Sequence, residues 1–211
     1  MGAREEWPGD GPLSAAPMRR ATTVVAMAVS SGPAPLGTPA PDFTLPDLDG
    51  APVALADFAN EPALLVAFVC NHCPYVRHVE QRLGSFYDAF EGTGLAMVAI
   101  CSNDVAAYPD DDVPRLREQA ERAGWRFPYL VDATQDVARA YGAVCTPDFF
   151  LFDADRRLAY RGAFDAATPG NAERVDGHLL RDAVSKVLAG RAVPLPHRPA
   201  LGCGIKWLED A

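Results

Sequence analysis

The sequence predicts an α/β fold with a central mixed β-sheet, helices on both faces of that sheet and a small β-hairpin before it. Three observations predict this fold. Two runs of consecutive apolar residues, at 63–69 and 95–101, are typical of strands that are buried on both faces. Segments with helical periodicity separate these strands, and strands joined by a helix pair in parallel. Two later strands, at 149–152 and 158–161, flank a tight turn and are expected to pair antiparallel.

The hairpin and the first helix surround the first buried strand. Segments 42–45 and 53–55 flank the turn-rich sequence PDLDGAP, which predicts the hairpin. After the buried strand, apolar residues recur at spacings of three and four, which predicts an amphipathic helix. These residues are Val76, Val79, Leu83, Phe86 and Phe90.

Three further helices are predicted after the second buried strand. Helical patterns at 113–123 and 134–141 each end at a glycine, Gly124 and Gly142 respectively. A closing helix at 175–188 carries its apolar side chains on one face and ends at Gly190. From residue 63 onwards the predicted order is therefore β-α-β-α-α-β-β-α, with a short third helix.

The chain is predicted to hold one domain, because 211 residues are enough to bury one substantial core. Residues 1–37 are rich in Ala, Pro, Gly and Ser and show no periodicity, so we expect a disordered N-terminal tail. The domain is expected to span 38–190. Residues 191–211 form a C-terminal extension that is too short for a second domain and is expected to dock onto the first.

Composition excludes several classes of partner. The 28 Asp and Glu residues outnumber the 19 Lys and Arg residues, and the net charge of −9 has the wrong sign for binding nucleic acid. No apolar run reaches the roughly 18 residues that a membrane span needs, so no membrane partner is expected. Glu5, Glu6 and Asp10 disrupt the basic start of a secretory signal, so we expect a cytoplasmic protein.

Cys70 and Cys73 form a Cys-x-x-Cys motif among five cysteines that are too unevenly spaced for a disulfide scaffold. The motif falls where the first buried strand gives way to a helix, and a helix N-terminus stabilises a thiolate. Pro74 suits a first helical turn, so the helix is expected to begin near Asn71. An imidazolium at His72 would lower the thiol pKa further. We therefore expect Cys70 to be the acidic nucleophile and Cys73 to resolve the mixed disulfide.

Three segments resemble the thioredoxin-fold superfamily and, within it, a peroxiredoxin-like redoxin branch of AhpC/TSA type. They are PAPDFTLPDLDG, FVCNHCPYVRH and YGAVCTPDFFLFDADRRLAYRG, and the resemblance covers about residues 37–190. It implies the thioredoxin-like topology. It also implies that Pro147 is preceded by a cis peptide bond and faces the Cys-x-x-Cys motif, while Thr146 offers backbone groups to a bound partner.

The sequence departs from each subfamily that it resembles. Ala67 stands where peroxiredoxins carry a threonine, and Pro147 lies near the position of their peroxide-polarising arginine, which argues against an efficient peroxidase. The motif also lacks the Gly-Pro of thioredoxin between its cysteines. His72 before the second cysteine is similar to the arrangement in periplasmic disulfide oxidases, so we expect a disulfide that is more oxidising than that of thioredoxin.

The leading hypothesis is a thiol–disulfide oxidoreductase that cycles Cys70 and Cys73 between dithiol and disulfide and uses no organic cofactor. A protein or small thiol would reduce it, and a disulfide or, more slowly, a hydroperoxide would oxidise it, which would give an antioxidant activity. The first alternative is a metal-binding module that holds copper or zinc through Cys70, Cys73 and a histidine. The second is a redox sensor in which Cys203 and the C-terminal segment respond to oxidation.

The other cysteines, the aspartate run, the other histidines and two tryptophans are expected to have mainly structural roles. Cys145 is expected near the active-site disulfide, where it either takes part in thiol exchange or serves as a small buried hydrophobe, and Cys101 is expected in the core. Cys203 is expected to be a surface thiol without a role, while a resolving or regulatory role is kept open for it. The segment 110–112 is expected to be a solvated loop in which Asp112 caps a helix. The other histidines are expected to be solvated, and two tryptophans are expected to pack against the domain: His78, His178, His197, Trp125 and Trp207.

Overall fold

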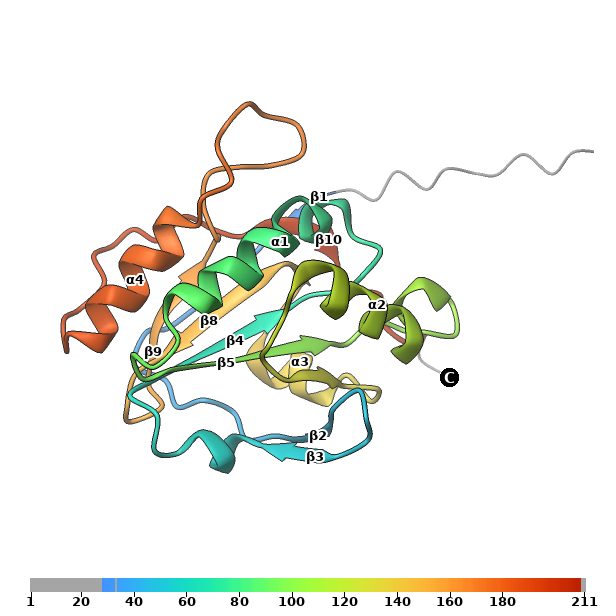
Figure 1. The fold of residues 1–211 in the computed structure, drawn as a ribbon, viewed down its shortest axis with the longest axis horizontal. Helices are drawn as coiled ribbons and strands as arrows, with labels where there is room; N and C mark the ends of the chain where they lie inside the picture. The colour runs from blue at the N-terminus through green and yellow to red at the C-terminus, as the bar shows by residue number, and fades with distance from the viewer. Residues whose placement is uncertain (1–27, 33, 210–211) are drawn as a thin grey trace, which may run out of the picture.

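The computed structural model describes residues 28–32 and 34–209 (Figure 1). The α-helices are α1 (Pro74–Ala89), α2 (Val113–Ala123), α3 (Asp136–Tyr141) and α4 (His178–Leu188), and two short 3-10 helices cover Leu55–Phe58 and Pro109–Asp111. The strands are β1 (Ala28–Ser30), β2 (Thr44–Pro46), β3 (Pro52–Ala54), β4 (Ala63–Phe68), β5 (Leu95–Cys101), β6 (Tyr129–Val131), β7 (Cys145–Thr146), β8 (Asp148–Phe152), β9 (Leu158–Gly162) and β10 (Leu201–Gly204).

The main sheet has five strands in the order β6-β5-β4-β8-β9. β4 pairs in parallel with β5, and β5 with β6, whereas β8 runs antiparallel to both β4 and β9. Every residue of the central strand β4 is buried, as its uninterrupted apolar run predicts. The predicted mixed sheet is therefore confirmed, and so is the hairpin, which is formed by β2 and β3.

Helices cover both faces of this sheet (Figure 1). Side chains of α1, α2 and α4 pack in one core layer with alternate residues of β4 and β5, including Leu65 and Met97. The remaining residues of the same strands, such as Leu64 and Val98, pack against α3 and the β2–β3 hairpin. This division follows from the strand period of two, and it confirms the prediction of helices on both faces.

A second, three-stranded sheet in the order β1-β10-β7 was not predicted. β10 pairs antiparallel with β1 on one side and with β7 on the other. The expected disordered tail of residues 1–37 is therefore wrong at its C-terminal boundary, because 28–30 form strand β1; residues 1–27 lie outside the described residues. The C-terminal extension docks onto the domain, as expected, through β10.

Short strands with weak sequence signals account for the other differences. β6 has three residues and follows Pro128, and its partner is the end of β5. β10 contains Gly202 and Gly204, and glycine disfavours strands unless neighbouring strands hold it in place. Trp125 is buried as expected, whereas Trp207 stays partly exposed beneath the guanidinium of Arg139. Within the described part of the chain, no helix has the length and apolarity needed to cross a membrane.

Candidate active site at the start of helix α1

Helix α1 begins three residues later than the sequence analysis places it. Pro74 is its first residue and Cys73 is the N-cap, with extended backbone at φ −69° and ψ 122°. The expected start near Asn71 is therefore wrong. Proline lacks an N–H group and fits a first helical turn, but the residue before it is held in extended geometry, so the helix cannot continue backwards through Cys73. The helix N-terminus thus faces the second cysteine of the motif.

Thr146 contacts both cysteines of the motif. Its hydroxyl lies 3.3 Å from the Sγ atom of Cys70, and its carbonyl oxygen lies 3.1 Å from the Sγ atom of Cys73. The peptide bond from Thr146 to Pro147 is cis, which confirms the expectation drawn from the resemblance. Both cysteine side chains are fully buried, and all five cysteines are present as free thiols.

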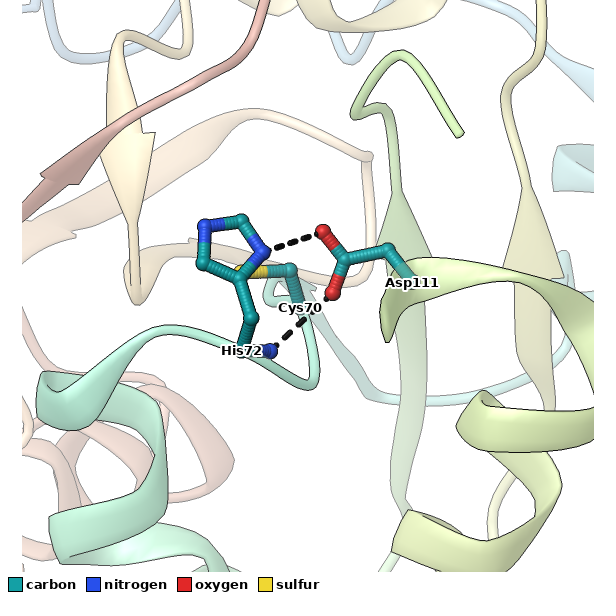
Figure 2. Close-up of side chains that lie close together, drawn as sticks. All are labelled: Cys70, His72 and Asp111. Carbon is teal, nitrogen blue, oxygen red and sulfur yellow. Dashed lines mark hydrogen bonds and ion pairs between the residues drawn. The ribbon is translucent and has the colours of Figure 1, made fainter. Parts of the chain in front are cut away.

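Asp111 organises the turn between the two cysteines from the opposite side (Figure 2). Its Oδ1 atom accepts hydrogen bonds from the backbone N–H groups of Asn71 at 2.8 Å and His72 at 3.1 Å. Its Oδ2 atom lies 2.6 Å from Nδ1 of His72 and 2.7 Å from Nδ2 of Asn103. Although burial opposes ionisation, the bonds from His72 and Asn103 hold the pKa of Asp111 below its usual value. The carboxylate is therefore ionised, and His72 donates through Nδ1.

The prediction that segment 110–112 is a solvated loop is wrong for Asp111, which is buried in the site. The Asp111 side chain is 1% exposed, and only its neighbours Asp110 and Asp112 follow the prediction. Asp112 caps α2 by accepting a hydrogen bond from the N–H of Arg115 at 2.9 Å, as expected.

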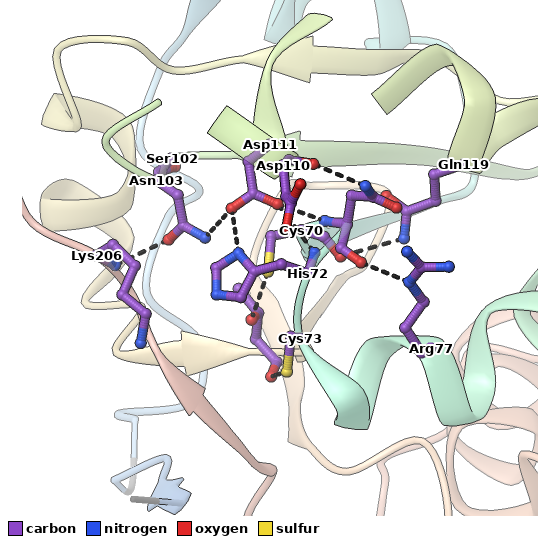
Figure 3. A network of polar contacts seen from close by, with 12 residues as sticks. Cys70, His72, Cys73, Arg77, Ser102, Asn103, Asp110, Asp111, Gln119 and Lys206 are labelled. Atoms are coloured by element: carbon purple, nitrogen blue, oxygen red, sulfur yellow. Dashed lines mark hydrogen bonds and ion pairs between the residues drawn. The ribbon is translucent and has the colours of Figure 1, made fainter. Parts of the chain in front are cut away.

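A second set of hydrogen bonds fixes the backbone of the motif (Figure 3). Gln119 donates from Nε2 to the carbonyl oxygen of Cys70 at 3.1 Å, and Arg77 donates from Nε to that of Asn71 at 2.7 Å. Arg122 reaches the side-chain oxygen of Asn71 at 2.7 Å and is itself paired with Glu80. Helices α1 and α2 thus both hold the Cys-x-x-Cys turn in one conformation.

The two motif thiols differ in acidity. Burial, the adjacent Cys73 thiol and the negative charge of Asp111 raise the pKa of Cys70 well above its usual value. Hydrogen bonds from the thiols of Cys203 and Cys70 and from the N–H of Val76 lower the pKa of Cys73 far below its usual value. These directions run against the expectation that Cys70 is the more acidic thiol, and the helix N-terminus lies at Cys73.

The other three cysteines are also buried, so the expectation that Cys203 is a surface thiol is wrong. Cys203 lies opposite Thr146 in the β10–β7 ladder, beside Cys73. Cys145 precedes Thr146 on β7, and its sulfur lies 3.9 Å from the carbonyl oxygen of Pro147. Burial raises the pKa of both Cys101 and Cys145. Cys101 is 2% exposed and belongs to the core, as predicted.

The metal-binding alternative is not favoured by the donor atoms. Among the described residues, the group with ligand atoms close enough to hold an ion is Cys70, His72 and Asp111, whose ligand atoms lie within 4.8 Å of one another. This is not the predicted set, because an aspartate replaces Cys73. Both oxygens of Asp111 already accept hydrogen bonds, and Nδ1 of His72 donates one of them.

Sequence comparison finds relatives among redox proteins. The chain is 27% identical over 125 residues to the thiol-disulfide oxidoreductase ResA of Geobacillus thermodenitrificans, which covers 58% of this chain and 66% of that protein. It is 31% identical over 132 residues to the chloroplastic peroxiredoxin Q of Triticum aestivum, covering 62% of this chain and 55% of that protein. The match thus spans less than two thirds of the length of either relative.

Structure comparison agrees on the fold. A hypothetical protein of Sinorhizobium meliloti 1021 is 49% identical, with a TM-score of 0.84 over 86% of this chain and 99% of that one. The thioredoxin domain of a thiol-disulfide oxidoreductase from Bacteroides vulgatus, at 23% identity, has a TM-score of 0.58 over 74% of this chain and 99% of that one. The fold is therefore thioredoxin-like, as predicted. Because the AhpC/TSA family matches residues 36–161, which is more than half of the sequence, the chain belongs to the AhpC/TSA family.

Proposed function

We propose that this protein is a thiol–disulfide oxidoreductase that cycles Cys70 and Cys73 between a dithiol and a disulfide. The observation that carries the proposal is the contact of Thr146 with both sulfurs, next to a cis-proline and at the start of a helix. A helix N-terminus stabilises the thiolate that attacks a disulfide, and a second thiol beside it completes the exchange. The membership in the AhpC/TSA family supports this chemistry.

Cys73 is the attacking thiol in this proposal. Its thiolate attacks one sulfur of the substrate disulfide, so that a Cys73–substrate bond forms while the substrate S–S bond breaks and one substrate thiolate leaves. Cys70 then attacks the Sγ atom of Cys73. The Cys70–Cys73 disulfide forms, the second substrate thiolate leaves, and the substrate has gained two electrons.

His72 and Asp111 serve the second step. Cys70 has a raised pKa and must lose its proton before it attacks, and a ring nitrogen of His72 lies within 4.8 Å of its sulfur. Asp111 binds His72 through Nδ1, which leaves Nε2 as the basic nitrogen of the ring. In this proposal His72 accepts the Cys70 proton, and Asp111 orients the ring.

The oxidant is a disulfide, and the reductant that restores the dithiol is a protein or a small thiol. Hydroperoxide reduction is a second and slower activity, for which membership in the AhpC/TSA family and the likeness to a peroxiredoxin argue. Ala67 cannot donate the side-chain hydrogen bond that a threonine would supply, and Arg161 is engaged with Asp148 at 2.8 Å. A hydroperoxide would therefore meet few groups that polarise it.

The test uses the reduced full chain and a small aromatic disulfide, 5,5′-dithiobis(2-nitrobenzoate), whose released thiolate is coloured. The wild type is expected to release two thiolate equivalents per molecule and to end with a Cys70–Cys73 disulfide, mapped by mass spectrometry after acid quenching. Cys73→Ser is expected to lose the fast release, while Cys145→Ser, the matched buried control, keeps it. A wild type that forms no Cys70–Cys73 disulfide would overturn the proposal.

A further inference from the structure

A third sulfur stands beside the motif. Cys203 is on β10, far from the motif in sequence, and is 1% exposed. In the β10–β7 ladder it lies directly opposite Thr146, the residue that contacts both motif cysteines. Its side chain belongs to the same core layer as Cys70 and Cys73.

The backbone holds β10 tightly in this place. A side chain on Gly202 would collide with the carbonyl group of Thr146, so β10 packs directly on the cis peptide. β10 is also tied on its other edge to β1, and the N–H of Ile205 donates to the carbonyl oxygen of Val144 at 3.1 Å. Beyond the strand, the N–H of Lys206 donates to Oδ1 of Asn103 at 2.8 Å. The position of Cys203 is therefore fixed relative to the motif.

We propose that Cys203 is a third redox-active thiol, which attacks the sulfur of Cys73 whenever that sulfur is part of a disulfide. The inference rests on the proposed function, because that function puts Cys73 into a disulfide. The Cys203–Cys73 bond forms and the bond from Cys73 to its earlier partner breaks. The earlier partner, Cys70 or a substrate thiol, leaves with the electron pair and takes up the proton that Cys203 gave up.

The acidity of Cys203 depends on the state of Cys73. In the reduced protein the hydrogen bond to Cys73 and burial raise the pKa of Cys203, so that it stays protonated and stabilises the Cys73 thiolate. A disulfide at Cys73 carries no negative charge, which removes the first of these two causes. Oxidation of Cys73 thus favours the thiolate of Cys203, and the thiol becomes a nucleophile when its target is ready.

Cys145 provides the matched control. It is as buried as Cys203 and lies on the strand that pairs with β10. Adjacent residues of a strand point to opposite faces, so Cys145 points away from the face that Thr146 turns toward the motif. Its sulfur is directed at the carbonyl oxygen of Pro147 instead.

The experiment again uses the aromatic disulfide, now with Cys70→Ser, which removes the proposed partner of Cys73. The single variant is expected to release a second thiolate equivalent and to yield a Cys73–Cys203 disulfide. The double variant Cys70→Ser/Cys203→Ser is expected to stop at one equivalent and to keep the aromatic adduct on Cys73. Cys70→Ser/Cys145→Ser should behave like the single variant. A Cys70→Ser protein that keeps the adduct, with Cys203 still free, would refute the inference.

Two further measurements keep the two proposals separate. If circular dichroism shows that Cys70→Ser does not fold, the disulfides of the oxidised wild type are mapped instead. The inference requires that a fraction of these molecules carry a Cys73–Cys203 disulfide and that Cys203→Ser abolish it. Absence of this disulfide from the wild type counts against the inference. A wild type that forms Cys70–Cys73 but never Cys73–Cys203 leaves the proposed function intact and rejects the inference. A wild type that forms neither disulfide rejects both.

Discussion

The Nδ1 atom of His72 lies 2.6 Å from the Oδ2 atom of Asp111. His72 is in the turn that follows β4, and Asp111 is in the 3-10 helix that follows β5. The same carboxylate also binds two backbone N–H groups of the turn. One side chain therefore sets the direction of the imidazole and the shape of the backbone between the cysteines.

Asp111→Asn is expected to destabilise the fold by about 2–4 kcal/mol, because it leaves buried donors with a poorer acceptor. Urea unfolding followed by circular dichroism measures the change. Asp110→Asn is the control, since the Asp110 side chain is exposed and should change the free energy of unfolding by less than about 0.5 kcal/mol. Equal effects of the two variants would contradict the role given to Asp111.

Asp148 predicts a pH dependence of stability. Burial raises its pKa to about 6 although Arg161 opposes the shift. Because this folded-state pKa is above the unfolded value of about 3.9, protonation of Asp148 stabilises the folded state. This contribution to the free energy of unfolding is complete below about pH 4 and is lost as the pH rises through about 6. The shift corresponds to roughly 2–3 kcal/mol. Asp148→Asn should remove this part of the slope in urea unfolding between about pH 4 and 6.5; an unchanged slope would argue against the shift.

The order of thiol acidity is testable by alkylation. Iodoacetamide labelling of the reduced wild type across a pH series, read by mass spectrometry, is expected to modify Cys73 at lower pH than Cys70. Cys101 and Cys145, whose pKa values are raised by burial, serve as internal references and should react last. Modification of Cys70 at lower pH than Cys73 would contradict this order of acidity and would support Cys70 as the more acidic thiol.

The reduction potential of the Cys70–Cys73 disulfide is expected to lie above the value of about −270 mV known for thioredoxin. Stabilisation of the Cys73 thiolate stabilises the reduced form, which makes the disulfide more oxidising. Equilibration with glutathione buffers and quantification of free thiols gives the potential. A value at or below that of thioredoxin would show that the thiolate is not stabilised to this extent.

Gly202→Ala is expected to loosen β10 from β7, because the added methyl group collides with the carbonyl of Thr146. Overpacking of this kind costs about 1–3 kcal/mol, measured by thermal or urea unfolding. Gly204→Ala lies two residues away, and there the new methyl group would meet Cγ2 of Val29 at 3.4 Å, an ordinary contact. The second variant should therefore be tolerated, and similar losses in both would point to glycine flexibility instead of packing.

The elements with long apolar patterns were predictable from the sequence, and the short ones were not. β4 and α1 bury enough side chains for their periodicity to be visible, and the structure confirms both. β1 and β10 are three and four residues long, which is too short for a visible period, and backbone hydrogen bonds between them and from β10 to β7 hold them in place. Pairing between the two ends of a chain leaves no local signal.

The site was predictable in its sulfur atoms and in its cis-proline, but not in its electrostatics. Helix α1 begins three residues after the predicted start, so its N-terminus lies at Cys73 and not at Cys70. Asp111 was hidden in a run of three aspartates that resembles a solvated loop. One signal could have identified it: the run follows β5, whose carboxyl end meets that of the parallel strand β4.

Cys203 lies outside the part of the chain that matches the AhpC/TSA family. The family segment ends at residue 161, whereas strand β10 lies about forty positions beyond it. Proteins that share the segment but differ in their last strand would inherit the two-cysteine motif without its neighbour. The match to the family within residues 36–161 therefore does not cover the strand that carries Cys203.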